Sequence, residues 1–186
     1  STLLNVVGSV RAIAKYTRDL EYYATRDPLT DLYNQRTFRE FLDYEVDRAA
    51  RRGYPFALLL VDLDNFKSVN DHFGHQLGDR FLQDFAQAIS ERLRGGDVLA
   101  RYGGDEFVIL LPETDGEQAR ATARRVMDGA QGVVVETSEG GTVRATASLG
   151  VAVYPDHADD PNDLFMFADN MMYRAKSEGK NRIGMP

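Results

Sequence analysis

The sequence predicts an α+β domain in which helices flank a mostly antiparallel central sheet, preceded by an N-terminal helix. Two observations support this fold class. Residues 54–64 contain a nearly unbroken apolar run, as expected for a central strand that is covered on both faces. Two later pairs of apolar segments are joined by turn sequences, at Gly103-Gly104 and around residues 138–141, which is typical of antiparallel hairpins.

The composition fits one globular domain with some extra length. The chain has 186 residues, 43% of them hydrophobic, and its lack of cysteine excludes disulfides and thiolate zinc sites. No apolar stretch approaches the ~20 residues of a membrane span, and no signal peptide pattern is present, so we expect a cytoplasmic location, including the cytoplasmic part of a membrane-bound sensor. A net charge of −7 without a long basic run argues against DNA as a partner.

The first expected element is a helix over residues 1–26, ahead of a domain over residues 27–186. Its apolar positions recur at spacings of three and four over about three heptads. They are Leu3, Val6, Val10, Ile13, Thr17, Leu20 and Ala24. This seam fits a stalk that pairs with a second copy in a homodimer, and equally a helix that lies on its own domain. Because the chain opens inside this pattern and without methionine, we expect an upstream sensory domain in a longer protein.

The remaining elements follow in order from turn and capping residues. Pro28 ends the first helix, Asn34 can cap a helix that runs to about residue 52, and Gly53 ends it. After the strand at 54–64 we expect helices at 65–74 and 76–93, then strands at 98–102 and 106–111. A helix at 115–130, a hairpin whose second strand spans 142–154, a helix at 163–177 and a short strand at 182–185 complete the order.

Acidic residues lie at the ends of two predicted strands. Asp62 and Asp64 are two positions apart and therefore share one face of the strand, while Asp105 and Glu106 begin the second strand of the hairpin. If these strands are neighbours, three or four carboxylates converge and cannot remain ionised without a cation. Oxygen ligands favour Mg²⁺ or Mn²⁺, and a pair of such ions suits phosphoryl or nucleotidyl transfer. An ordinary hairpin turn flanked by acids is the alternative.

Four blocks of the sequence resemble the GGDEF family of bacterial diguanylate cyclases, from about residue 27 to the C-terminus. They are DPLTDLYN, VDLDNFKSVNDHFGHQLGD, GGDEF and YRAKSEGKN. The resemblance implies a palm-like nucleotidyl cyclase fold that condenses two GTP molecules into cyclic di-GMP, with release of pyrophosphate, across a homodimer. One departure is Asp31, which stands where glycine is common in the family.

The resemblance also implies the residues of a catalytic and metal site. Asp62, the Leu63 carbonyl, Asp105 and Glu106 would hold Mg²⁺ or Mn²⁺, and Asp105 and Glu106 would be catalytic, with Glu106 helping to activate the 3′-hydroxyl. These roles agree with in-line displacement at the α-phosphorus. We expect Asp64 to cap the following short helix rather than to bind metal.

Substrate contacts are implied in the same way. Asn70 and Asp79 would recognise guanine, since an amide can donate to O6 and N7 while a carboxylate accepts from N1–H and N2–H₂. Phosphates would meet backbone amides at a helix start and two lysines, and two glycines would allow close approach of the nucleotide. These residues are Asn65, Phe66, Lys67, Lys176, Lys180, Gly103 and Gly104.

Residues 94–97, with the sequence RGGD, resemble the family's RxxD product-inhibition site. Arg94 and Asp97 would bind cyclic di-GMP there, with Arg124 or Arg125 on the next helix as a further contributor. A catalytically silent receptor for GTP or cyclic di-GMP, and another palm-type cyclase or polymerase, are the competing hypotheses. The intact acids of the signature favour an enzyme, and Asn70 with Asp79 favours guanine.

Overall fold

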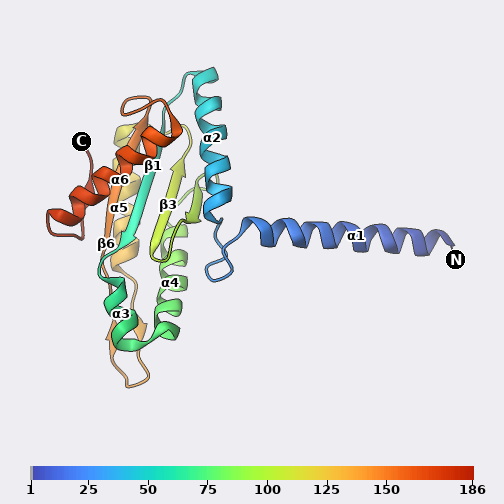
Figure 1. Cartoon of the computed structure of the whole chain (residues 1–186), viewed down its shortest axis with the longest axis horizontal. Coiled ribbons are helices and arrows are strands. Elements are labelled where there is room, and N and C mark those ends of the chain that lie inside the picture. The colour runs from blue at the N-terminus through green and yellow to red at the C-terminus, as the bar shows by residue number, and fades with distance from the viewer. Residues whose placement is uncertain (1) are drawn as a thin grey trace.

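The computed structural model describes the backbone of residues 2–186 and the side chains from residue 10 onward. Helix α1 (Thr2–Thr25) projects away from the remainder of the chain (Figure 1). Its described seam residues Val10, Ile13 and Leu20 are exposed, so the helix does not lie on its own domain; Leu3 and Val6 lie outside the described side chains. None of the described helices combines the length and hydropathy that a membrane crossing requires.

A five-stranded sheet forms the centre of the domain, in the order β2-β3-β1-β6-β7. Strand β1 (Phe56–Leu63) pairs antiparallel with β3 (Glu106–Leu111) on one side and with β6 (Ala147–Tyr154) on the other. Strand β2 (Val98–Arg101) extends this sheet beyond β3, and β7 (Ile183–Gly184) pairs parallel with β6. Every residue of β1 is buried, which confirms the central strand predicted from its apolar run.

Helices cover both faces of the sheet. Alternate residues of β1 point to opposite sides, so Leu58 and Leu60 pack with α2 (Gln35–Arg52) and α6 (Pro161–Ser177). Leu59 and Val61 pack on the other face, with α3 (Phe66–Phe73), α4 (His75–Ser90) and α5 (Gly116–Gln131). The mostly antiparallel α+β fold is therefore confirmed.

Helix ends agree with the predicted caps within a few residues. The Asn34 side chain accepts a hydrogen bond from the Thr37 amide at the start of α2, and Gly53 ends that helix in the left-handed region, at φ 71°. Helix α6 begins at Pro161 rather than at residue 163, because Asp160 caps it.

The second hairpin differs from the prediction. The segment expected as one strand over residues 142–154 is divided into β5 (Thr142–Val143), which pairs with β4 (Val135–Glu136) in a separate two-stranded sheet, and β6. Between them, the Thr146 carbonyl accepts from the Asp64 amide and its hydroxyl donates to the Asp64 carboxylate. These contacts tie the chain to the end of β1 at the point where it enters the central sheet.

Candidate active site

Pairing of β1 with β3 brings the acidic strand ends together. Asp62 lies directly opposite Glu106, and the Leu63 amide donates to the Asp105 carbonyl at 3.2 Å. Directly opposed residues of an antiparallel pair have Cβ atoms roughly 5 Å apart. The two strands are therefore neighbours, as the expectation required, and their pairing places Asp62 across from Glu106.

Strand alternation separates the acids by face. Leu60 and Val108, two residues along their strands from Asp62 and Glu106, pack in the layer beneath α2 and α6, so both carboxylates belong to that side. Asp105 lies in the turn before β3 and is one residue out of phase. Accordingly, no group of three or more acidic or histidine side chains within the described part of the chain is assembled closely enough to hold a metal by itself.

A lysine ammonium meets the buried acid at this strand end. The Lys176 Nζ lies 2.7 Å from Asp62 Oδ1, and the two side chains are 31% and 10% exposed. Burial raises the pKa of Asp62 to about 6, the Lys176 ammonium opposes that rise, and Asp105 and Glu106 add to it by repulsion. The Asp62 carboxylate therefore accepts a cation in a largely dry position, and the oxygen-only donor set around it fits a hard divalent ion.

Asp64 does not have the capping role predicted for it. Its carboxylate accepts from the Thr146 and Ser148 hydroxyls at 2.6 and 2.7 Å and from the Asn181 amide at 3.0 Å. Helix α3 instead starts after Asn65, at φ 55°, with no side-chain cap. The prediction was wrong because these three donors are distant in sequence; the available signal was Ser148, a polar residue in the otherwise apolar β6, with Thr146 just before the strand.

The Asp64 contacts also fix the turn after α6. Lys180 and Asn181 have left-handed backbones, at φ 63° and 48°, and the Asn181 amide is held by Asp64. From this turn the Lys180 Nζ donates to Asn65 Oδ1 at 2.6 Å. Lys176 and Lys180 thus both reach the end of β1, from α6 and from the turn that follows it.

Asn70 and Asp79 come from α3 and α4, which pack against each other. A Cβ placed on the buried Gly78 would lie 1.8 Å from Asn70 Oδ1, so the Asn70 amide rests on the α4 backbone at that position. Asp79 is the next residue of α4 and is exposed. Asn70 therefore makes this helix contact, and Asp79 is next to it in sequence.

The signature turn has its own supports. The Gly103 amide donates to the Glu106 carbonyl at 3.2 Å, and a Cβ on Gly103 would lie 2.7 Å from Glu106 Oε2. Arg101 donates to the Gly104 carbonyl at 2.7 Å and forms an ion pair with Asp27 at 3.2 Å. Sequence reasoning missed Asp27 and Arg101; both lie in or beside matching blocks, but only folding brings their charges together.

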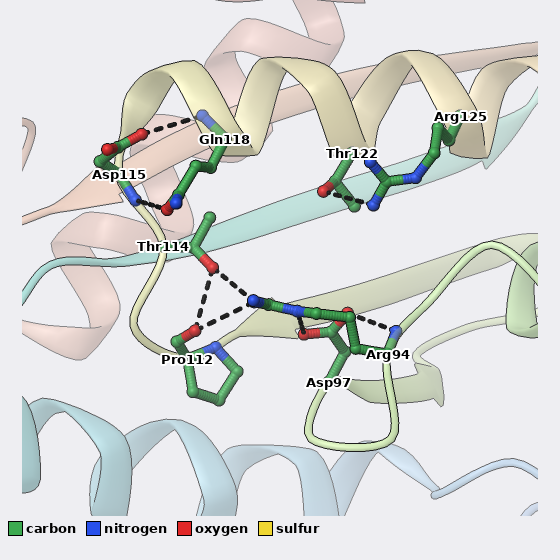
Figure 2. Close-up of polar contacts among 8 residues, drawn as sticks. All are labelled: Arg94, Asp97, Pro112, Thr114, Asp115, Gln118, Thr122 and Arg125. Carbon is green, nitrogen blue, oxygen red and sulfur yellow. Dashed lines mark hydrogen bonds and ion pairs between the residues drawn. The ribbon is translucent and has the colours of Figure 1, made fainter.

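Residues 94–97 form a tight polar loop (Figure 2). Asp97, whose side chain is 1% exposed, accepts from the Arg94 amide at 2.8 Å and from Arg94 Nε at 3.3 Å. The 58% exposed Arg94 side chain also donates to the Pro112 carbonyl and, at 2.8 Å, to the Thr114 hydroxyl. Arg94 is thus held at the end of β3 and remains open to solvent.

An open cavity of about 340 Å³ lies beside this loop. Its lining residues are Arg48, Arg94, Gly96, Asp97, Pro112 and Glu113. Arg125 does not line it; this side chain lies farther along α5 and donates to the Thr122 hydroxyl at 3.0 Å (Figure 2). Arg94 and Asp97 therefore border a concave surface whose second guanidinium comes from Arg48 of α2 and not from Arg125.

Comparison with known proteins gives consistent matches. The family described as "Diguanylate cyclase, GGDEF domain" matches residues 24–182. The probable diguanylate cyclase DgcT of Escherichia coli is 35% identical over 161 residues, which are 86% of this chain and 35% of DgcT. The chain spans less than half the length of the curated relatives that it matches first.

Two solved structures share the fold. The diguanylate cyclase SiaD of Pseudomonas aeruginosa, in complex with its activator SiaC, is 33% identical with a TM-score of 0.83, over 97% of this chain and 70% of SiaD. The coiled coil and GGDEF domain of DgcB from Caulobacter crescentus, in complex with c-di-GMP, is 26% identical with a TM-score of 0.90, over 98% and 96% of the two chains.

Proposed function

The chain belongs to the GGDEF family of diguanylate cyclase domains, and from this membership we propose that it condenses two GTP molecules into cyclic di-GMP with release of pyrophosphate. The observation that carries this proposal is the pairing of Asp62 with Glu106 across β1 and β3, with Asp105 in the adjoining turn. These acids stand beside Lys176 and Lys180, which supply positive charge for a triphosphate. The intact acids argue against a silent receptor.

The acids would hold the divalent ions that nucleotidyl transfer requires. We assign Mg²⁺ or Mn²⁺ to Asp62, the Leu63 carbonyl, Asp105 and Glu106; when bound, such ions offset triphosphate charge and polarise the α-phosphate. The oxygen-only donors and the ion pair between Asp62 and the Lys176 ammonium support this assignment.

Each transfer forms one bond and breaks one. The 3′-oxygen of one GTP attacks the α-phosphorus of the other, its proton passes to the Glu106 carboxylate, and the bond to the β-phosphate oxygen breaks to release pyrophosphate. The two lysines and the amides of Asn65, Phe66 and Lys67 would orient the phosphates, and the Gly103-Gly104 turn would admit them. A second transfer, with the roles reversed, closes the ring.

Base recognition would take place between α3 and α4. The Asp79 carboxylate can accept from guanine N1–H and N2–H₂, and the Asn70 amide can donate to O6 and N7. Adenine lacks this pattern of donors and acceptors, so the pair argues against an adenylate-forming cyclase. The contact of Asn70 with Gly78, the residue before Asp79, supports a shared base site.

One base site per domain requires two domains to face each other. We propose a homodimer formed through residues 1–26, with residues 27–186 as the catalytic domain and an upstream sensory domain as a partner in the full-length protein. Exposure of Val10, Ile13 and Leu20 on the projecting α1 supports pairing with a second copy. Product would bind at Arg94 and Asp97, beside the open cavity, and inhibit synthesis.

The activity is tested directly by incubating the protein with GTP and Mg²⁺ and identifying products by mass spectrometry. Wild type, at a concentration where light scattering shows a dimer, should yield cyclic di-GMP and pyrophosphate. Asp105→Ala should abolish product while its circular dichroism spectrum and Tm stay close to wild type, and Asp43→Ala, an exposed acid of α2, serves as control. Turnover retained in Asp105→Ala would contradict the assigned role.

A further inference from the structure

Lys176 forms an ion pair with the buried Asp62 at the end of β1. Among the described residues, the Asp62 carboxylate has one charged or hydrogen-bonding partner, the Lys176 ammonium at 2.7 Å. An acid that is 10% exposed needs such compensation to remain ionised. Lys176 therefore stands where a cation bound by Asp62 would have to come close.

The second lysine of this region provides a contrast. Lys180 reaches the same strand end, but its ammonium donates to the neutral amide oxygen of Asn65 at 2.6 Å rather than to a carboxylate. Only one of the two predicted phosphate-binding lysines is thus engaged with a predicted metal ligand. Lys176 lies in the last turn of α6, between the buried Ala175 and the exposed Ser177 that ends the helix.

We propose that Lys176 is an exchangeable counter-cation, which neutralises Asp62 until a divalent ion takes that carboxylate and the ammonium moves to the triphosphate. This inference rests on the proposed function of the site. The lysine side chain suits the exchange because it carries a compact point charge on a flexible stem, and a short rotation about its side-chain bonds relocates that charge.

The exchange couples metal binding to nucleotide binding. A divalent ion that binds alone must displace an ammonium that has no new anion to meet, which weakens its binding. When the nucleotide binds as well, its phosphate oxygens receive the released ammonium, and the cost of displacement falls. By linkage, the metal must then raise nucleotide affinity by the same factor as the nucleotide raises metal affinity.

A structural ion pair alone predicts a different outcome. If Lys176 only stabilised the fold, its removal would lower Tm and would not tighten metal binding in the absence of nucleotide. Under the exchange, removal of the ammonium leaves the Asp62 carboxylate without its competing cation. We expect Mn²⁺ to bind at least about fivefold more tightly without nucleotide, which corresponds to about 1 kcal/mol.

The test measures Mn²⁺ binding by electron paramagnetic resonance, with and without a non-hydrolysable GTP analogue. Lys176→Met and Lys176→Gln both remove the charge, Lys176→Arg keeps it, and Lys180→Met removes the neighbouring lysine that has no acidic partner. Thermal unfolding establishes that each variant is folded. The first two should gain Mn²⁺ affinity without nucleotide and lose most of the enhancement that the analogue gives to wild type, whereas the other two should keep the weak nucleotide-free binding of wild type.

Unchanged or weaker nucleotide-free binding in folded Lys176→Met and Lys176→Gln, with analogue-dependent Mn²⁺ binding intact in wild type, would overturn the exchange and leave the proposed metal site standing. An equal gain in Lys180→Met would overturn it as well, because the effect would then be one of general charge. Failure of wild type to bind Mn²⁺ even with the analogue would overturn both the exchange and the metal assignment.

Discussion

A single methyl group on α4 should move the predicted guanine-binding amide without unfolding the protein. Gly78 is buried, and the Cβ of an alanine there would lie 1.8 Å from Asn70 Oδ1 and 3.4 Å from the Phe66 ring. The closest atom is the end of a side chain, so Asn70 can turn away and relieve the overlap. The perturbation thus acts on the site through its geometry, while Asn70 itself stays unaltered in sequence.

The two energetic effects of Gly78→Ala have opposite signs for folding and for binding. Alanine stabilises a helix interior by up to about 1 kcal/mol relative to glycine, which offsets the cost of moving Asn70. Displacement of the amide removes one or two hydrogen bonds to guanine, each worth about 0.5–1.5 kcal/mol. The loss of about 0.5–3 kcal/mol corresponds to GTP affinity that is roughly 2- to 150-fold weaker.

The assay is calorimetric titration with a non-hydrolysable GTP analogue, together with thermal unfolding. Gly78→Ala should bind weakly with a Tm near or above that of wild type, and Asn70→Ala should show a similar loss of affinity. In the Asn70→Ala background, Gly78→Ala should cost little more, because the group that it displaces is already gone. Full affinity in Gly78→Ala, or additive losses in the double variant, would refute the placement of Asn70 at the base.

Four further predictions concern other parts of the molecule. Arg94→Ala should raise by tenfold or more the cyclic di-GMP concentration that halves the rate, with initial turnover retained; unchanged inhibition in a product titration would reject this site. The folded pKa of Asp62, about 6, lies above its ordinary 3.8, so the contribution of its protonated carboxyl to stability is full below pH ~4 and is lost as pH rises through about 6. With a chelator present, the free energy of unfolding of wild type should therefore fall across this window relative to that of Asp62→Asn. Parallel curves from urea titrations of the two proteins would show that the pKa of this carboxyl is not raised. Asp31 has a left-handed backbone at φ 60°, and its side chain accepts a hydrogen bond from the Tyr22 hydroxyl of α1. Asp31→Gly should leave Tm within a few degrees, because glycine adopts this backbone readily, but amide hydrogen exchange near the end of α1 should become faster. Exchange equal to that of wild type would show that the Tyr22–Asp31 hydrogen bond does not hold the end of α1. Gly150→Ala would place a Cβ 2.0 Å from a backbone carbonyl oxygen of α6, which cannot rotate away. The free energy of unfolding should therefore fall by about 1–3 kcal/mol or more. A denaturation midpoint equal to that of wild type would mean that α6 and β6 can move apart at little cost.

Features carried by local sequence were predictable, and those made by distant pairs were not. The apolar run of β1 and the Asn34 cap depend on adjacent residues, and the structure has both. The local sequence also located acids at the ends of two strands, but only the fold shows that β1 and β3 are neighbours and that Asp62 pairs with Glu106. By contrast, Asp64 is bound by a residue 117 positions away, so a capping role was the only local interpretation open to it. The division of residues 142–154 into two strands has the same origin, because the break is set by contacts with Asp64 rather than by a turn residue.

The location of the acids at the end of β1 follows from the burial of that strand. Since β1 is covered along its whole length, a carboxylate in its interior would remain uncompensated, whereas at the end of the strand Lys176 from the final turn of α6 meets Asp62. Asp62 thus requires a cation for physical reasons that do not depend on catalysis, and the fold meets this need with Lys176. A site that already needs a cation can exchange one for another without rebuilding the sheet. Lys176 can therefore partly offset the cost of the buried carboxylate before the substrate arrives, and a divalent ion can take over that role once the substrate is present.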